Sequence, residues 1–100
     1  MDKYQVKISL QAQRDIDSIY TYIKNALLEP TIAINLVDEI SSAITGLAVL
    51  PNRGTIRETG IYKNRQYRQL FVRNYTIIYK VIESTKQVII ITVQYSRRDI

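Results

Sequence analysis

The side chains best suited to catalysis in this chain are arginines, tyrosines and carboxylates of its second half. Cleavage of RNA through the 2′-hydroxyl requires a base for that hydroxyl, cations for the crowded phosphorane and an acid for the leaving oxygen. Tyr95 is the candidate acid, and Glu58 and Glu83 are the candidate bases. The candidate cations are Arg68, Arg73, Arg97 and Arg98. A structural role competes with each assignment, because arginines also keep a sheet surface soluble and a tyrosine that ends a strand often only packs.

Cysteine and histidine are both absent from the sequence. Their absence excludes disulfides, thiol nucleophiles, zinc sites of the Cys/His kind and Ser-His-Asp triads. Catalysis without imidazole would depend on groups whose reference pKa values lie far from neutrality. We therefore expect any catalysis to proceed by electrostatic stabilisation and positioning, and we expect no metal and no cofactor.

Charge is divided unevenly along the chain. Residues 1–50 contain four Lys/Arg and six Asp/Glu, a net charge of −2, whereas residues 51–100 contain ten and three, a net charge of +7. A half this basic predicts an anionic partner, either nucleic acid or an acidic protein. The hypothesis requires that the cations of the late strands converge on one exposed patch.

A basic cluster flanks the central loop of the sequence, and tyrosines are interleaved with the cations. Tyr75, Ile77 and Tyr79 share one predicted strand face, which favours core packing of the two tyrosines, whereas Tyr62 and Tyr67 are the candidates for stacking on a base. The candidate residues for binding a target or partner are Arg53, Arg57, Lys63, Arg65, Tyr67 and Arg73. Their contacts to phosphates or carboxylates would depend strongly on salt. The alternative is an ordinary solvated basic loop.

The length of 100 residues predicts a single domain over residues 1–100. No stretch approaches the ~18 to 20 apolar residues that a membrane span needs. The N-terminal residues show no hydrophobic run typical of a secretory signal. We expect a cytoplasmic protein without a membrane association.

The first half predicts a strand followed by two helices. Alternating apolar residues predict a strand from about Lys3 to Ile8, and Ser9 is a plausible N-cap for the helix that follows. Apolar residues recur on one face of that helix as far as Leu27, and Pro30 interrupts the pattern. A second amphipathic helix then continues to Leu47, so the two helices should form an antiparallel hairpin.

The second half predicts a loop and three strands. The segment from Leu50 to Gly60 has no clear period and is a predicted loop. Residues rich in β-branched and aromatic types predict strands at Asn64 to Val72, Tyr75 to Glu83 and Val88 to Tyr95. The order β-α-α-β-β-β predicts an α+β fold, with a mostly antiparallel sheet of three to four strands and the helical hairpin packed on one face.

Several short motifs occur in an order that is typical of one protein family. They are Tyr4-x-Val6-x-x-Ser9-x-x-Ala12-x-x-Asp15-Ile16-x-x-Ile19-x-x-Tyr22-Ile23, Leu47-x-x-Leu50-Pro51-x-x-Gly54, Tyr67-Arg68-x-x-x-Val72-x-Asn74-Tyr75-x-Ile77-x-Tyr79 and Val93-x-Tyr95-x-Arg97-Arg98-Asp99. In this order the sequence resembles the RelE/ParE toxins of bacterial type II toxin-antitoxin systems over nearly its whole length.

The resemblance implies a growth-inhibiting toxin, of the kind associated with plasmid stabilisation, that a cognate antitoxin neutralises in a toxin-antitoxin hetero-oligomer. RelE-like members cleave mRNA on the ribosome with arginines, lysines and a tyrosine, whereas ParE-like members poison DNA gyrase. A shared fold therefore leaves the target open.

Carrying the RelE-like site over residue by residue gives a mixed result. Arg68 falls near a basic position of the family, and Arg97 or Arg98 fits the basic residue near the end of the last strand. However, Thr76 stands where the RelE-like motif has arginine, and Tyr95 stands where many relatives have histidine. The resemblance therefore favours gyrase poisoning or another non-nucleolytic action slightly over mRNA cleavage. The alternatives are a non-toxic nucleic-acid-binding module and a decayed toxin that only binds antitoxin.

Overall fold

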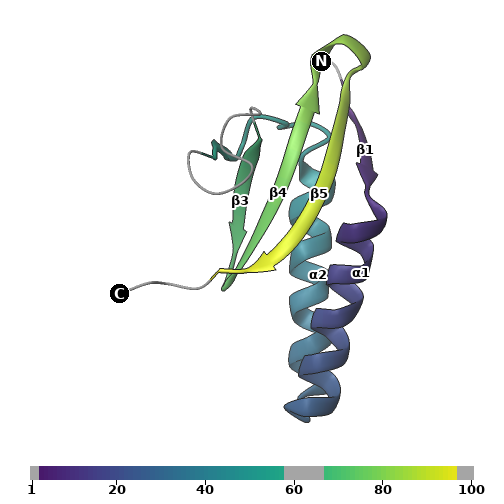
Figure 1. Cartoon of the computed structure of the whole chain (residues 1–100), viewed down its shortest axis with the longest axis vertical. Helices are drawn as coiled ribbons and strands as arrows, with labels where there is room; N and C mark the ends of the chain where they lie inside the picture. Colours follow the sequence, from purple (N-terminus) through teal and green to yellow (C-terminus); the bar gives the residue numbers. More distant parts are fainter. Residues whose placement is uncertain (1–2, 58–66, 97–100) are drawn as a thin grey trace.

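The computed structural model describes residues 3–57 and 67–96. They form two layers, a sheet and a helical hairpin that covers one of its faces (Figure 1). The elements are β1 (Gln5–Ile8), α1 (Leu10–Thr21), the π-helical turn η1 (Tyr22–Ala26), α2 (Pro30–Gly46), β2 (Thr55–Ile56), β3 (Arg68–Val72), β4 (Tyr75–Ile82), the 3₁₀ turn η3 (Glu83–Thr85) and β5 (Gln87–Tyr95). The predicted α+β fold and the hairpin on one face are confirmed.

Among the described residues the sheet has five strands in the order β1-β5-β4-β3-β2, where three to four were predicted. The additional strand is β2, which lies within the segment predicted to be a loop. Its residues Thr55 and Ile56 pair with Gln69 and Arg68 of β3. A strand of two residues shows no alternation, so the sequence pattern could not reveal it. The β2–β3, β3–β4 and β4–β5 pairs are antiparallel, whereas β1 pairs with β5 in parallel.

Ser9 connects the first strand to the first helix, as predicted. Its Oγ accepts a hydrogen bond from the Ala12 N–H at 3.0 Å, which satisfies one of the free donors of the helix N-terminus. The same hydroxyl donates to the carbonyl oxygen of Ile91 at 2.7 Å. Ile91 lies where the β4–β5 register shifts, between the Tyr79–Ile90 and Ile78–Thr92 pairs. The cap therefore also fixes α1 against the irregular part of β5.

The hairpin turns at Leu28, which adopts a left-handed conformation with φ of 56°. Pro30 then occupies the first turn of α2, where its missing N–H costs nothing. Figure 1 shows that the hairpin extends well past the end of the sheet at which β3 and β4 are joined. Within the described residues, this overhang leaves part of the apolar helix surface without a covering strand.

The core lies between the hairpin and the sheet. Its largest fully buried side chains include Tyr79, Ile77 and Ile90 from the strands and Ile40 and Leu47 from α2 and its end. Tyr75 packs against this cluster and Tyr79 belongs to it, so the predicted core packing of both tyrosines is confirmed. In the described part of the chain, no helix has the length and apolar character that crossing a membrane requires.

Candidate functional site

A groove of about 940 Å³ lies where the hairpin overhangs the sheet. Its apolar part comes from both helices and from the ends of β4 and β5. The lining residues are Asp15, Ser18, Ile19, Tyr22, Ile23, Leu27, Ile32, Asn35, Leu36, Arg73, Asn74, Tyr75, Val93 and Tyr95. Large side chains in it remain accessible, with Tyr22 58 %, Leu27 51 % and Ile32 53 % exposed. An exposed apolar concavity with a polar rim is typical of a surface that binds a partner.

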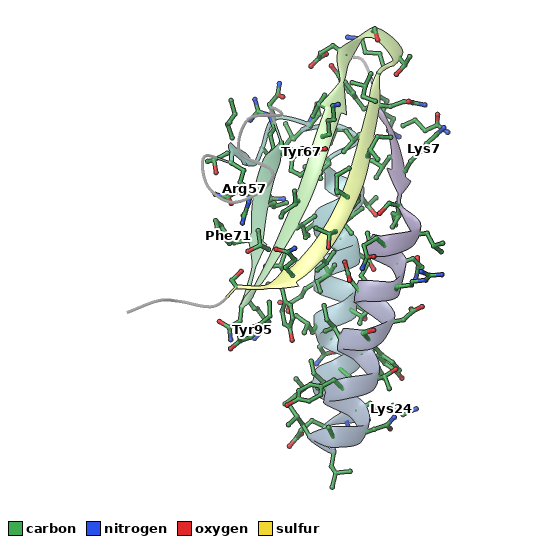
Figure 2. The ribbon with its side chains drawn as sticks, in the orientation of Figure 1. Lys7, Lys24, Arg57, Tyr67, Phe71 and Tyr95 are labelled. Atoms are coloured by element: carbon green, nitrogen blue, oxygen red, sulfur yellow. The ribbon has the colours of Figure 1, made fainter. Side chains whose placement is uncertain are left out.

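Two tyrosines form one end of the groove. The rings of Tyr75 and Tyr95 meet edge to face, with their centroids 5.6 Å apart. Tyr95 is 64 % exposed at the end of β5, and Figure 2 shows it close to the β3–β4 turn. Burial raises the pKa of the Tyr75 phenol above its ordinary value, so this hydroxyl stays protonated at neutral pH. It can serve as a hydrogen-bond donor but not as a base.

Asp15 holds the wall of the groove to the sheet. Its Oδ2 accepts hydrogen bonds from the Val93 N–H at 3.0 Å and from the Thr92 hydroxyl. The pairing of β1 with β5 ends at Ile90, so Val93 lies beyond the end of β1. The carboxylate therefore provides the partner that an additional residue of β1 would have provided.

We predict that Asp15→Ala lowers the free energy of unfolding by about 1–3 kcal/mol, because it leaves the Val93 N–H without its acceptor. Asp15→Asn keeps an oxygen that can accept this bond and serves as the matched control, with a smaller loss. Urea unfolding of the two variants measures the difference. Equal stability of wild type and Asp15→Ala would show that the bond contributes nothing.

Arg73 lies on the rim of the groove in the β3–β4 turn. Its backbone is left-handed, with φ of 52°, a conformation that is unfavourable for a residue with a Cβ. Its guanidinium forms a two-point ion pair with Glu39 of α2, which includes an Nη2 to Oε1 distance of 3.2 Å. The pair lowers the pKa of the Glu39 carboxyl and raises that of Arg73. Arg73 thereby joins the turn to α2 across one side of the groove.

A second cationic feature lies on the open face of the sheet, the face away from the helices. The Arg57 Nη1 donates to Gln69 Oε1 at 2.7 Å, and the Lys80 ammonium lies 6.0 Å from the centre of the Tyr67 ring. The Arg57 Nε is buried without a hydrogen-bond partner among the described residues. Figure 2 shows Arg57 and Tyr67 in the same upper part of the sheet. We call Arg57, Tyr67, Gln69 and Lys80 the open-face cluster.

Arg68 lies elsewhere, at the start of β3, and bonds to the loop that precedes β2. Its Nη1 donates to the Gly54 carbonyl oxygen at 2.7 Å. Tyr79 holds the same loop, because its hydroxyl donates to the Pro51 carbonyl oxygen at 2.8 Å and accepts from the Gly54 N–H at 2.9 Å. Burial raises the pKa of the Tyr79 phenol. The guanidinium of Arg68 is thus engaged with backbone carbonyls.

Comparison with known proteins identifies the family. The family model for the ParE toxin of the type II toxin-antitoxin system parDE matches residues 6–100. The chain belongs to this family of toxins. A comparison with curated proteins finds no match.

Solved structures of related systems share the fold. The chromosomal ParDE toxin-antitoxin system of P. aeruginosa contains a chain with a TM-score of 0.77 and 21 % identity, over 95 % of this chain and 98 % of that one. The RelBE2 toxin-antitoxin complex of Mycobacterium tuberculosis gives 0.66 and 20 %, over 99 % and 97 %. An E. coli RelE toxin variant in the free state gives 0.65 and 12 %, over 95 % and 85 %.

The cations of this ParE-family chain do not converge on one patch within the described residues, contrary to our expectation. Arg57 belongs to the open-face cluster, Arg68 bonds to the Gly54 carbonyl and Arg73 pairs with Glu39. Arg53 is exposed beside α2, in a shallow hollow that also includes Glu39 and Phe71. Alternation along β3 separates these residues, since Arg68 and Gln69 point to opposite faces. Other candidates, Glu58, Tyr62, Lys63, Arg65, Arg97 and Arg98, lie outside the described residues.

The described candidates for RNA cleavage are far apart in this ParE-family toxin. Glu83 lies in η3, before the start of β5, whereas Tyr95 ends β5. At ~3.3 Å per residue, β5 separates them by roughly 25 Å. Glu83 instead accepts a hydrogen bond from Tyr4. Thr76, which replaces the RelE-like arginine, is buried and bonds to the Ser96 hydroxyl.

The sequence pattern did not indicate a function for most of the groove residues. Leu27 belonged to the apolar stripe of the first helix, which predicts packing inside the protein. Tyr22 occurred only in a family motif, and Ile32 belonged to no predicted stripe. Their exposure depends on the overhang of the hairpin, which periodicity does not report. No group of three or more acidic side chains that could hold a metal ion is present in residues 3–57 and 67–96.

Proposed function

We propose that this toxin inhibits growth by a non-nucleolytic action, with DNA gyrase as the favoured target, and that a cognate antitoxin neutralises it by filling the groove. The observation that carries the proposal is the exposed apolar groove in a chain of the ParE family. The buried Thr76 and the distance between Glu83 and Tyr95 support an action other than mRNA cleavage. The protein would act in the cytoplasm, where gyrase and ribosomes are found.

The chemistry of the groove favours a helical antitoxin segment over an extended one. An extended segment would need free main-chain groups, yet Asp15 already occupies the Val93 N–H that faces the groove. An amphipathic helix needs only apolar surface for side chains at i, i+3 or i+4 and i+7. Leu27 and Ile32, which line the groove and are about half exposed, offer this surface.

The open-face cluster is the proposed target surface. Arg57 and Lys80 lie there beside Tyr67, and a helix in the groove would not cover this face of the sheet. A gyrase–DNA complex presents both phosphates and protein carboxylates to such a cluster. Contacts of this kind weaken with salt, by about one log unit of affinity per log unit of salt for each phosphate.

Induced expression in a bacterium, with and without the neighbouring antitoxin gene, tests the proposal. We expect growth arrest without antitoxin, rescue with it, and inhibition of DNA supercoiling by purified gyrase while cellular mRNA stays intact. Cleavage of translated mRNA that is lost in folded Arg68→Ala or Arg98→Ala would overturn the non-nucleolytic mechanism. Normal growth with soluble, folded toxin would instead support a decayed toxin if antitoxin still binds, or a nucleic-acid-binding module if the chain binds RNA or DNA alone.

A further inference from the structure

The outer edge of β1 is an unpaired sheet edge in the described part of the chain. β1 pairs with β5 on one side, and Figure 1 shows no strand beyond it on the other. In a parallel ladder, alternate residues direct their main-chain groups to the neighbouring strand. Gln5 and Ser9 do so, with N–H groups that donate to the carbonyl oxygens of Lys86 at 2.9 Å and Ile90 at 3.0 Å.

Val6 and Ile8 therefore direct their N–H and C=O groups outward. Tyr4 shows the same direction, because its N–H donates to the Ala48 carbonyl oxygen at 2.8 Å, away from β5. No described residue bonds to the Val6 or Ile8 N–H. The N–H and C=O groups of Val6 and Ile8 thus provide two donors and two acceptors along the edge. An extended segment can add to such an edge as a new strand.

Side chains at this edge indicate the chemistry of the segment. Lys3 and Lys7 are exposed and lie on the same side of the strand by alternation, with Arg14 exposed on the first turns of α1. Figure 2 shows Lys7 at the outer margin of the sheet. On the helix side, Ile8 is 45 % exposed and the adjoining Leu10 is 66 % exposed. A complementary strand would carry acidic side chains on one face and apolar side chains on the other.

We infer that the β1 edge binds an extended acidic segment of the antitoxin, which adds to the sheet as a sixth strand. The inference rests on the proposed antitoxin partner and identifies a second contact, separate from the groove. Pairing of two copies through this edge is disfavoured, because it brings the lysines of both copies together. An acidic segment turns the same charges into attraction.

Amide hydrogen exchange at single residues tests the inference, with the full chain free and in complex with the antitoxin from the neighbouring gene. In the free chain we expect Val6 and Ile8 to exchange at least about tenfold faster than Gln5 and Ser9, whose N–H groups are bonded. In the complex the two pairs should exchange at similar rates. Comparison within one strand corrects for the general stabilisation that any binding produces.

Charge reversal gives a second readout. Lys7→Glu should weaken antitoxin binding by about tenfold at low salt, whereas the matched control Lys24→Glu, at the far end of the hairpin, should change it by less than about twofold. Fast exchange at Val6 and Ile8 in a complex that does form would overturn this inference and leave the antitoxin proposal intact. Failure of any complex to form would overturn both. Protection of Val6 and Ile8 in the free chain, together with dimerisation, would assign the edge to self-association instead.

Discussion

Replacing Gly54 with alanine is expected to lower the free energy of unfolding by about 3 kcal/mol. A Cβ at this position would lie 2.4 Å from the Gln69 carbonyl oxygen and 2.8 Å from the Tyr79 hydroxyl. The first of these atoms belongs to the backbone of β3 and cannot move without disturbing the sheet. The change would also displace the Tyr79 hydroxyl that holds the loop before β2. Urea unfolding monitored by tyrosine fluorescence measures the loss.

Gly46→Ala is the matched control for this methyl group. Gly46 ends α2, and the nearest atom to an added Cβ is the end of the flexible Arg53 side chain at 3.9 Å. Because alanine favours a helix over glycine, we expect this variant to be neutral or more stable by up to about 1 kcal/mol. If Gly54→Ala were as stable as Gly46→Ala, the close approach of the loop to β3 would be wrong.

The groove gives the second large expected effect. Ile32→Asp should weaken antitoxin binding by at least about 100-fold, because it buries a carboxylate in an apolar contact. The fold should tolerate the change, since Ile32 is half exposed and lies in the first turn of α2, where an acidic side chain interacts favourably with the helix dipole. Titration of purified toxin with antitoxin measures the affinity, and growth under co-expression measures neutralisation.

Phe71→Asp is the control for this prediction, because Phe71 is 59 % exposed and does not line the groove. It introduces the same charge at a similar exposure outside the groove, so binding of antitoxin should stay within about threefold of wild type. Complete neutralisation of Ile32→Asp by the antitoxin would exclude the groove as the main docking surface. A loss of growth inhibition by Phe71→Asp alone would instead extend the proposed target surface toward the end of β3.

The sequence predicted the elements well because their signals are local. Ser9 acts as the predicted N-cap, and the apolar period placed Ala12, Ile16 and Ile23 on the buried side of the first helical segment. The predicted strands that begin near Tyr75 and Val88 are observed at Tyr75–Ile82 and Gln87–Tyr95. Each of these signals depends on neighbours within a few residues, which fold in the same way in many tertiary contexts.

The candidate site could be predicted only in part. The cations were correctly recognised as a feature of the second half, but their surroundings depend on pairing between distant segments. Arg68 bonds to Gly54 because β2 pairs with β3, and Arg73 pairs with Glu39 because the hairpin packs under the β3–β4 turn. Asp15 is one position of the first family motif, and only the structure shows that its carboxylate accepts hydrogen bonds from Thr92 and Val93 of β5.

The amino-acid order by itself determined the α+β class, the helical hairpin, the main strands and the charge contrast between the two halves, because periodicity, capping and composition act over short distances. The tertiary structure decided where the groove and the free edge lie. The groove arises because the sheet ends before the hairpin, and the edge arises because no described strand pairs with the outer side of β1. The relative lengths and the pairing order of distant segments set both features, and neither is encoded in the pattern of a single segment.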